Sequence, residues 1–360
     1  MQFTDNITYS RFCIQLYHCT IKKVVCYDYG NMRIKVLGSG FYGCHLAVSL
    51  LEDGHDVEIY EISDRIFAGA SGAIPARIHR GFHYPRSSVT RDACNAHYAE
   101  FMSQYGKFTS TVAVNIYAIA ARESLIDFET YRKILKDTVE FITIEYPEEY
   151  GLLNVEGAIL TGERHIVIER ARKHFESLLS NHIVFNKAPD EEGNFDWTID
   201  ATFCANESIG VERYEPCVVP ILKGSETSKA VTIMDGPFPS LYPWNEERGL
   251  SSLSSALWSP FSKTCKTYLE ARHILDNLSQ ADLKERGTQM IESMAVFYPT
   301  INEYMPVDYK VSIRAMPKSN SDARLVEVVK TSPNVIRIRA GKIDAVIQAG
   351  KEVKSIIGES

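Results

Sequence analysis

One stretch of the sequence, Arg33–Glu61, limits the possible fold more than any other. It contains a short apolar strand, a glycine turn, an apolar helical stripe and a second strand that ends in a carboxylate. Gly38 permits the tight turn, Gly40 lets the backbone approach a pyrophosphate, and Gly43 allows the helix to pack closely on the strand. Glu61 follows at the spacing of a carboxylate that accepts hydrogen bonds from ribose hydroxyl groups. The stretch therefore predicts a dinucleotide-binding βαβ unit.

Composition excludes several classes of protein. The formal net charge of −7 over 360 residues, with no dense run of Lys and Arg, gives no reason to expect nucleic acid as a partner. No apolar run reaches the ~18 residues that would span a bilayer. The eight cysteines form no C-x-x-C pair and no zinc spacing. We therefore expect reduced thiols, a cytoplasmic location and no metal site. Nothing in the sequence specifies an oligomeric state.

Residues 1–31 precede the first predicted strand and carry three cysteines. They lack the apolar core followed by small residues that marks a signal peptide. We expect a poorly packed N-terminal extension. The alternative is an edge strand over residues 21–27, with the sequence IKKVVCY.

A second group of residues follows the βαβ unit. Small residues concentrate at 68–73, which suggests a backbone lying against a flat ligand. The pattern Ile78-His79-x-Gly81-x-x-Tyr84 comes next. Together with the glycine fingerprint, it resembles the D-amino-acid-oxidase-like superfamily of FAD-dependent oxidoreductases. Flavin-linked glycerol-3-phosphate and L-2-hydroxyglutarate dehydrogenases carry a similar run that ends in I-H-x-G.

The resemblance implies an α/β fold in which a Rossmann-like FAD-binding domain carries an inserted α+β substrate domain, built on a mainly antiparallel sheet. We expect non-covalent FAD, since no residue marks a tether. The alternatives are that the histidine of the I-H-x-G pattern contacts the flavin without catalysing the reaction, or that it anchors the flavin covalently. The expected cofactor contacts are Gly38, Gly40, Phe41, Tyr42, Gly43, Glu61, Arg65, Ser71, Gly72, Val184, Ala201, Thr202, Gly341 and Lys342. At Gly341 and Lys342, the start of the closing helix is expected to face the flavin's pyrimidine edge.

The chain departs from the family pattern in two places. Members usually have Asp-Ala-Thr-Gly after the later strand, whereas this chain has Phe203 in place of the glycine. The backbone there should avoid φ > 0, or approach the cofactor less closely. Members also often carry a histidine near the closing helix, but this chain has none after His273.

Periodicity predicts the remaining elements and a discontinuous domain arrangement. Helices are expected over 92–105, 163–179, 266–293 and 343–357, and strands over 111–120, 214–224, 230–235, 250–258 and 335–339. We assign 32–95, 150–205 and 310–360 to the FAD-binding domain, and 96–149 and 206–309 to the substrate domain.

The implied chemistry is the oxidation of a C–H bond next to an amine or hydroxyl group of a small, anionic substrate. The flavin takes the hydride and a general base takes the other proton. His79 is the first candidate for that base, because an imidazole can accept a proton near pH 7. The alternatives for this role are His83 and Tyr84. The candidates for binding an anionic group are Arg80, Arg86 and Arg314.

Three other functions stay open at this point. The chain could be a non-redox flavoprotein acting on a sugar or nucleotide sugar, or a degenerate FAD-binding protein, which Phe203 and the altered closing segment suggest. An NAD-dependent dehydrogenase would also use the glycines and Glu61. Ser71-Gly72, the I-H-x-G pattern and the Asp-Ala-Thr strand favour FAD over NAD.

Overall fold

The computed structural model describes residues 31–75, 77–137, 139–188, 193–226, 228–318 and 324–358. The expectations for the N-terminal extension, including the edge strand over 21–27, lie outside these residues.

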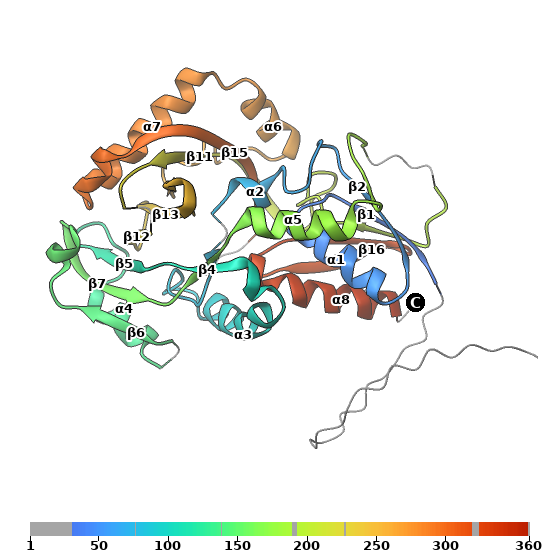
Figure 1. Cartoon of the computed structure of the whole chain (residues 1–360), viewed down its shortest axis with the longest axis horizontal. Helices are drawn as coiled ribbons and strands as arrows, with labels where there is room; N and C mark the ends of the chain where they lie inside the picture. The colour runs from blue at the N-terminus through green and yellow to red at the C-terminus, as the bar shows by residue number, and fades with distance from the viewer. Residues whose placement is uncertain are drawn as a thin grey trace, which may run out of the picture.

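A six-stranded sheet with the order β16-β17-β10-β1-β2-β9 forms the first half of the molecule (Figure 1). Its strands are parallel except β16, which runs antiparallel to β17. The strands are β1 (Arg33–Leu37), β2 (Asp56–Tyr60), β9 (Ile183–Val184), β10 (Trp197–Asp200), β16 (Glu327–Ser332) and β17 (Val335–Arg339). The predicted βαβ unit is confirmed, with helix α1 (Phe41–Glu52) as its crossover.

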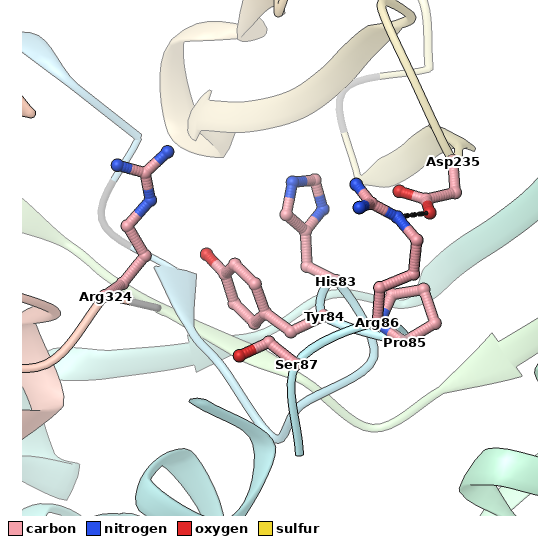
Figure 2. Close-up of a pocket in the computed structure, with 7 residues that line it drawn as sticks. All are labelled: His83, Tyr84, Pro85, Arg86, Ser87, Asp235 and Arg324. Atoms are coloured by element: carbon pink, nitrogen blue, oxygen red, sulfur yellow. Dashed lines mark hydrogen bonds and ion pairs between the residues drawn. The ribbon is translucent and has the colours of Figure 1, made fainter. Parts of the chain in front are cut away.

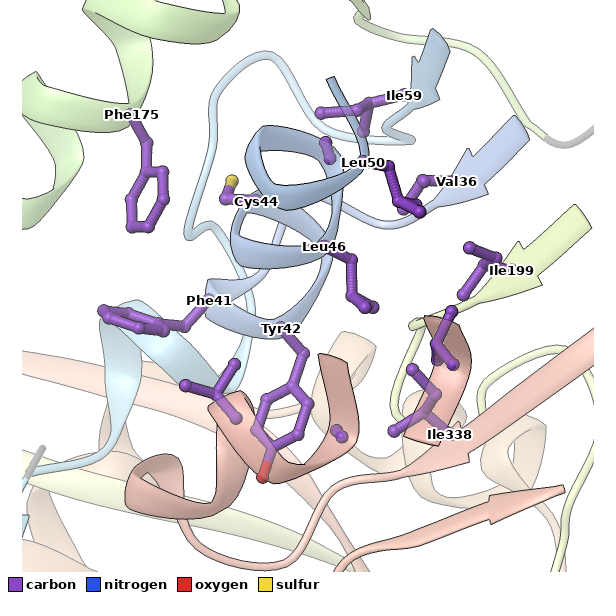
Figure 3. Packing of buried hydrophobic residues seen from close by; sticks show 14 of the residues in the cluster. Val36, Phe41, Tyr42, Cys44, Leu46, Leu50, Ile59, Phe175, Ile199 and Ile338 are labelled. Carbon is purple, nitrogen blue, oxygen red and sulfur yellow. The ribbon is translucent and has the colours of Figure 1, made fainter. Parts of the chain in front are cut away.

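Helix α1 packs on this sheet between two later helices. It contacts α5 (Ile168–Leu179) and α8 (Val346–Gly358). The apolar residues predicted for the strand and the helical stripe meet in one buried cluster, which Figure 3 shows around α1. Gly43 fixes how closely the helix approaches, because a Cβ atom built there would lie 1.9 Å from the carbonyl oxygen of Gly38.

An eight-stranded sheet with the order β15-β11-β14-β13-β12-β5-β7-β6 forms the second half (Figure 1). All its pairs are antiparallel except β5 with β12, so the expected mainly antiparallel sheet is confirmed. The strands are β5 (Val114–Ala120), β6 (Phe141–Ile144), β7 (Val155–Thr161), β11 (Val211–Lys223), β12 (Lys229–Met234), β13 (Pro239–Asn245), β14 (Leu250–Ser255) and β15 (Met305–Pro317).

The long helix expected over 266–293 is two helices, α6 (Tyr268–Asp276) and α7 (Gln280–Ala295). The break occurs where Ser279 and Asp282 form a capping box that starts α7. Because each side chain binds a backbone N–H of the other residue, this pair favours a new helix start over continuation.

A three-stranded sheet, β3 (Arg77–Ile78), β8 (Arg164–Ile166) and β4 (Thr109–Thr111), adds further pairing between distant segments. The helix predicted over 163–179 is therefore wrong at its start, since residues 164–166 pair with β3 and β4 before α5 begins. The remaining α-helices are α2 (Ala70–Ala73), α3 (Ser88–Tyr105) and α4 (Phe128–Leu135). The 3₁₀ helices are Gly106–Phe108, Pro147–Tyr150, Glu246–Arg248, Pro299–Glu303 and Ile343–Ala345.

Sheet membership differs from the domain boundaries expected at residues 150 and 310. Strands β7 and β15 both belong to the eight-stranded sheet. All of β7 (155–161) and the second half of β15 (310–317) nevertheless fall inside the segments that we assigned to the FAD-binding domain. The chain therefore passes between the two sheets at other residues than the expected boundaries.

Replacing Gly43 with alanine should destabilise the fold. The added Cβ would lie 1.9 Å from the Gly38 carbonyl oxygen, so α1 must move away from β1. We expect a loss of about 1–3 kcal/mol in the free energy of unfolding, measured by thermal unfolding of FAD-free protein. Gly162→Ala is the control, because its Cβ would meet nothing within 4 Å. Equal unfolding temperatures for Gly43→Ala and wild type would contradict this.

His45 should make the fold sensitive to acid. Burial lowers its pKa to about 4, and its Nδ1 lies 2.5 Å from the Tyr105 hydroxyl. The unfolded chain, with a histidine pKa of about 6.5, takes up this proton first, so stability falls as the pH drops from about 6.5 to 4. His45→Gln should remove up to about 3 kcal/mol of that loss. Urea unfolding across this range is the measurement, and parallel curves for variant and wild type would refute it.

Candidate functional site

The carboxyl ends of β1, β2, β10 and β17 meet along one edge of the six-stranded sheet, where open α/β sheets bind ligands. Gly38 leaves β1 at φ +89°, a conformation that a side chain would strain. Gly40 begins α1 without a side-chain cap and without an acidic residue in the first turn. That helix end therefore offers N–H groups and positive potential to an anion. A Cβ atom on Gly40 would meet only the Ser71 hydroxyl, at 3.3 Å.

Glu61 lies at the same edge, directly after β2. Its Oε2 accepts from the backbone N–H and the hydroxyl of Ser39 at 2.8 and 2.7 Å, and its Oε1 accepts from Ser63 N–H at 2.8 Å. The carboxylate thus also holds the glycine turn in place. Val184 pairs with Tyr60 at the end of β9, and its half-exposed side chain is available to a flat ring beside Glu61.

The Asp-Ala-Thr segment ends β10 next to the glycine turn. A Cβ atom on Gly38 would lie 3.1 Å from the Ala201 carbonyl oxygen, and 3.3 Å from Thr202 Cα. The expectation that Phe203 avoids positive φ is wrong, because it adopts φ +61°. Phe203 and Cys204 both take this left-handed conformation, so the chain keeps the turn without glycine at the cost of local strain.

The small-residue run also lies against this edge. Ser71 Oγ accepts from the N–H of Phe41 at 3.0 Å, at the start of α1. Gly72 leaves no room for a side chain, since its Cβ would lie 2.0 Å from the Phe67 carbonyl oxygen. Arg65, also predicted as a cofactor contact, is exposed in the loop before this run.

The closing segment reaches the site from the C-terminal side. The Tyr42 hydroxyl donates to the Lys342 carbonyl at 2.5 Å, which links α1 to this segment. A Cβ on Gly341 would lie 2.3 Å from the Arg324 carbonyl oxygen. Burial lowers the pKa of Lys342 to about 8 and raises the pKa of Asp344 to about 7. Neither carboxylate oxygen of Asp344 has a hydrogen-bond partner among the described residues.

These features fit a bound FAD. The uncapped helix start suits the pyrophosphate, Glu61 suits the ribose, and the glycines at 38, 40, 43 and 72 stand where side chains would clash or crowd the turn. The residues predicted for the two ends of the cofactor, 184 and 341–342, come to this edge from segments far apart in the chain.

The predicted catalytic residues form one cluster beside this edge. The ring centroids of His79 and His83 are 5.7 Å apart, and Tyr84 lies 5.5 and 5.3 Å from them. The Lys342 ammonium sits 4.3 Å from the Tyr84 ring centroid. The pKa of both histidines is well below the usual value, mainly because the rings are buried and secondly because positively charged groups lie nearby. Both imidazoles are therefore neutral and able to accept a proton.

His83 and Tyr84 also face a cavity of about 150 Å³, which Figure 2 shows. Arg86 and Arg324 lie at its sides, and Arg86 Nε is 2.5 Å from Asp235 Oδ2. Polar side chains and positive charge thus line a space next to the histidines.

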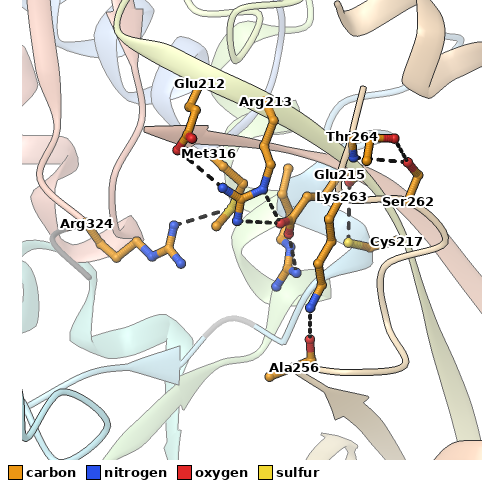
Figure 4. A network of polar contacts seen from close by, with 11 residues as sticks. Glu212, Arg213, Glu215, Cys217, Ala256, Ser262, Lys263, Thr264, Met316 and Arg324 are labelled. Atoms are coloured by element: carbon orange, nitrogen blue, oxygen red, sulfur yellow. Dashed lines mark hydrogen bonds and ion pairs between the residues drawn. The ribbon is translucent and has the colours of Figure 1, made fainter. Parts of the chain in front are cut away.

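The other two predicted arginines lie elsewhere. The guanidinium of Arg80 is 5.0 Å from the ring centroid of Tyr98. Arg314 forms an ion pair at 2.7 Å with Glu215, its register partner across β11 and β15. Arg213 binds the other oxygen of that carboxylate, as Figure 4 shows. The charge of Arg314 is therefore already balanced within the protein.

Two buried charged residues join the histidine cluster without having been predicted. Glu163 is 1% exposed and lies 3.7 Å from His79 Nδ1, measured from Oε1. Arg77 donates to Thr232 at 3.1 Å and Ser240 at 2.6 Å, and its guanidinium stacks 4.1 Å from the Tyr242 ring centroid. Arg77 thereby connects β3 to the eight-stranded sheet. In the sequence, Arg77 could have been noticed because it directly precedes the Ile-His pair of the I-H-x-G pattern.

The part of the chain that the structure describes contains no group of three or more His, Cys, Asp or Glu side chains that could hold a metal ion. No helix within the described ranges is both long and apolar enough to cross a membrane.

Comparisons with known proteins identify FAD-dependent relatives. No protein-family model matches the chain. FAD-dependent monooxygenase FPY4 of Fusarium mangiferae is 30% identical over 338 residues, covering 90% of each chain. FAD-dependent monooxygenase kojA of Aspergillus flavus is 24% identical over 376 residues, covering 91% of this chain and 86% of that protein.

Solved structures share the fold at low sequence identity. Glycine oxidase from Geobacillus kaustophilus matches with a TM-score of 0.65 and 12% identity, over 92% of this chain and 96% of that one. The dithionite-reduced, FAD-bound L-α-glycerophosphate oxidase from Mycoplasma pneumoniae matches with a TM-score of 0.64 and 13% identity, over 91% and 95%. The chain therefore belongs to the same family as the FAD-dependent monooxygenase FPY4, and it shares the D-amino-acid-oxidase-like fold of the FAD-dependent oxidoreductases among its structural neighbours.

Proposed function

We propose that this FAD-dependent oxidoreductase oxidises a C–H bond next to an amine or hydroxyl group of a small, anionic substrate. The observation that carries the proposal is the buried cluster of His79, His83 and Tyr84 beside the cofactor edge, next to a cavity with arginines at its sides. Membership in an oxidoreductase family argues against the non-redox and degenerate alternatives, and the FAD-dependent relatives argue against NAD.

When bound, FAD would accept a hydride from the substrate carbon. The residues proposed to hold it non-covalently are those at the sheet edge, with Gly38–Gly43 at the pyrophosphate, Glu61 at the ribose and Gly341 and Lys342 at the ring. His79 would accept the hydroxyl or amine proton, because its neutral imidazole has one ring nitrogen with a free lone pair. His83 and Tyr84 are the alternative groups for this proton.

The anionic group of the substrate would bind in the cavity beside Arg86. A guanidinium gives two parallel hydrogen bonds to a carboxylate or phosphate. Of the predicted arginines, Arg86 has the strongest support because it lines the cavity, where its Nε is paired with Asp235. Arg314 has weaker support because it does not line this cavity and is paired with Glu215.

A second candidate function follows from the relatives, two of which are called FAD-dependent monooxygenases. A monooxygenase puts one oxygen atom of O₂ into its product, whereas an oxidase releases peroxide and a dehydrogenase passes electrons to another acceptor. The same histidine cluster could serve either reaction by moving a proton at the substrate.

The cytoplasmic location also remains our proposal. The cysteines at 44, 94, 204, 217 and 265 are all buried and free, and reduced thiols are usual in a reducing compartment.

A substrate panel should separate the reactions. We expect purified protein to show a flavin spectrum that is bleached, without oxygen, by one member of a panel of amino acids, hydroxy acids and glycerol phosphates. Under ¹⁸O₂, label in the product would support the monooxygenase, and label only in peroxide would support the oxidase. A protein that binds FAD but is reduced by NADPH and by no panel member would contradict the proposed direct oxidation.

His79→Ala should retain FAD but lose turnover. The residue lies beside the cofactor edge and not in the glycine turn, so binding of FAD should change little. The rate of flavin reduction should fall by roughly 10²–10⁴-fold, the contribution of a general base. His273→Ala is the control, because that histidine is exposed on α6. An unchanged rate in His79→Ala would remove this residue from the mechanism and leave His83 and Tyr84.

A further inference from the structure

Glu163 occupies an unusually constrained position for a carboxylate. It is 1% exposed, and its Oε1 accepts from the Arg80 N–H at 2.7 Å while its Oε2 accepts from the Tyr117 hydroxyl at 2.5 Å. Its backbone carbonyl also accepts from the Asn115 side chain at 3.4 Å. With both oxygens and the backbone fixed, the carboxylate has one available orientation.

The backbone places Glu163 opposite His79. Strands β3 and β8 are antiparallel, with Arg77 paired to His165 and Ile78 paired to Arg164. Continuing this register by one residue would place His79 opposite Glu163, just beyond the ends of both strands. The observed distance between the two side chains agrees with this placement. The paired strands β3 and β8 therefore bring the two residues together.

The two side chains meet through one ring nitrogen. His79 Nδ1 is 3.7 Å from Glu163 Oε1, and this nitrogen has no hydrogen-bond partner among the described residues. Such contacts are often long in ligand-free sites and tighten when the ligand binds. An Nδ1–H group that faces a carboxylate leaves Nε2 without a proton, because a neutral imidazole carries only one.

We propose that Glu163 is a positioning residue that holds His79 as the Nδ1–H tautomer, so that Nε2 is the atom that accepts the substrate proton. This inference rests on the proposed function of His79 as the base. The proton would leave the hydroxyl or amine group of the substrate and form a bond to Nε2, while the C–H bond breaks and a C=O or C=N bond forms in the substrate, with bound FAD as the hydride acceptor. The imidazolium that results faces the Glu163 carboxylate, which stabilises its charge.

The other charged groups around His79 disfavour its protonated form, whereas the Glu163 carboxylate favours it. Lys342 and Arg77 are the cations that lower the pKa of His79. The remaining neighbour of the ring is His83. Within the part of the chain that the structure describes, Glu163 is the carboxylate that lies within ion-pair distance of the His79 ring. Its position therefore decides which nitrogen carries the proton.

The test is the tautomer of His79, read from ¹⁵N chemical shifts of histidine-labelled, FAD-loaded protein. The His79 signals are identified by their loss in His79→Ala. We expect wild type to show the Nδ1–H tautomer, and Glu163→Gln to lower the ratio of Nδ1–H to Nε2–H by about tenfold, the effect of losing a hydrogen bond to a charged group. A purely structural role of Glu163 would leave this ratio unchanged.

Tyr117→Phe is the matched control, because it removes the contact to the other oxygen but keeps the carboxylate. This variant should retain the Nδ1–H tautomer. The inference would be overturned by an Nε2–H tautomer of His79 in the wild type, or by an unchanged tautomer ratio in Glu163→Gln. If Glu163→Gln does not fold, the tautomer observed in the wild type still tests the inference. An unchanged rate of flavin reduction in His79→Ala would overturn the base role separately, since it leaves the tautomer measurement unaffected.

Discussion

The close approach of α1 to β1 at Gly38 and Gly43 is the contact on which the rest of the site depends. The helix can begin directly above the strand end because neither residue has a side chain between them. Its uncapped first turn then points to the edge where four parallel strands end. Glu61, the 201–202 segment and the closing segment reach the same edge, each by following its own strand. A single methyl group at Gly43 would push the helix away from β1. The N–H groups at the start of α1 would then move away from the Glu61 carboxylate at the same edge.

Burial of charge between the two large sheets is the second constraint. Arg77 and Glu163 lie on or next to strands of the small sheet, and their partners lie on the eight-stranded sheet. Burying an unpaired charge is costly, so each of these groups is hydrogen-bonded to neutral hydroxyl groups. The hydrogen bonds tie β3 and the residue before β8 to β12, β13 and β5. His79 and His83 lie beside these hydrogen-bonded groups, and His83 also faces the cavity.

The same fold occurs in proteins named for different reactions, including a glycine oxidase and a glycerophosphate oxidase. A shared fold does not fix the reaction, which depends on the groups that face the cofactor ring and the substrate. In this chain we propose that those groups are two neutral histidines, a tyrosine and a lysine, with Arg86 and Arg324 at the adjacent cavity. On this proposal the residues at the sheet edge hold the cofactor, and the cluster decides what the flavin can oxidise.

The sequence by itself determined the nucleotide unit, because glycine spacing, strand periodicity and a carboxylate at a fixed distance are local properties of residues 33–61. It also determined the grouping of His79, His83 and Tyr84, which are neighbours along the chain. It could not reveal the contact of Glu163 with His79, because that contact depends on the pairing of β3 with β8, two strands that are far apart in the sequence. The pairing of Arg314 with Glu215 and the left-handed turn at Phe203 were decided in the same way. In each case the energy comes from long-range pairing and burial, which local pattern does not encode.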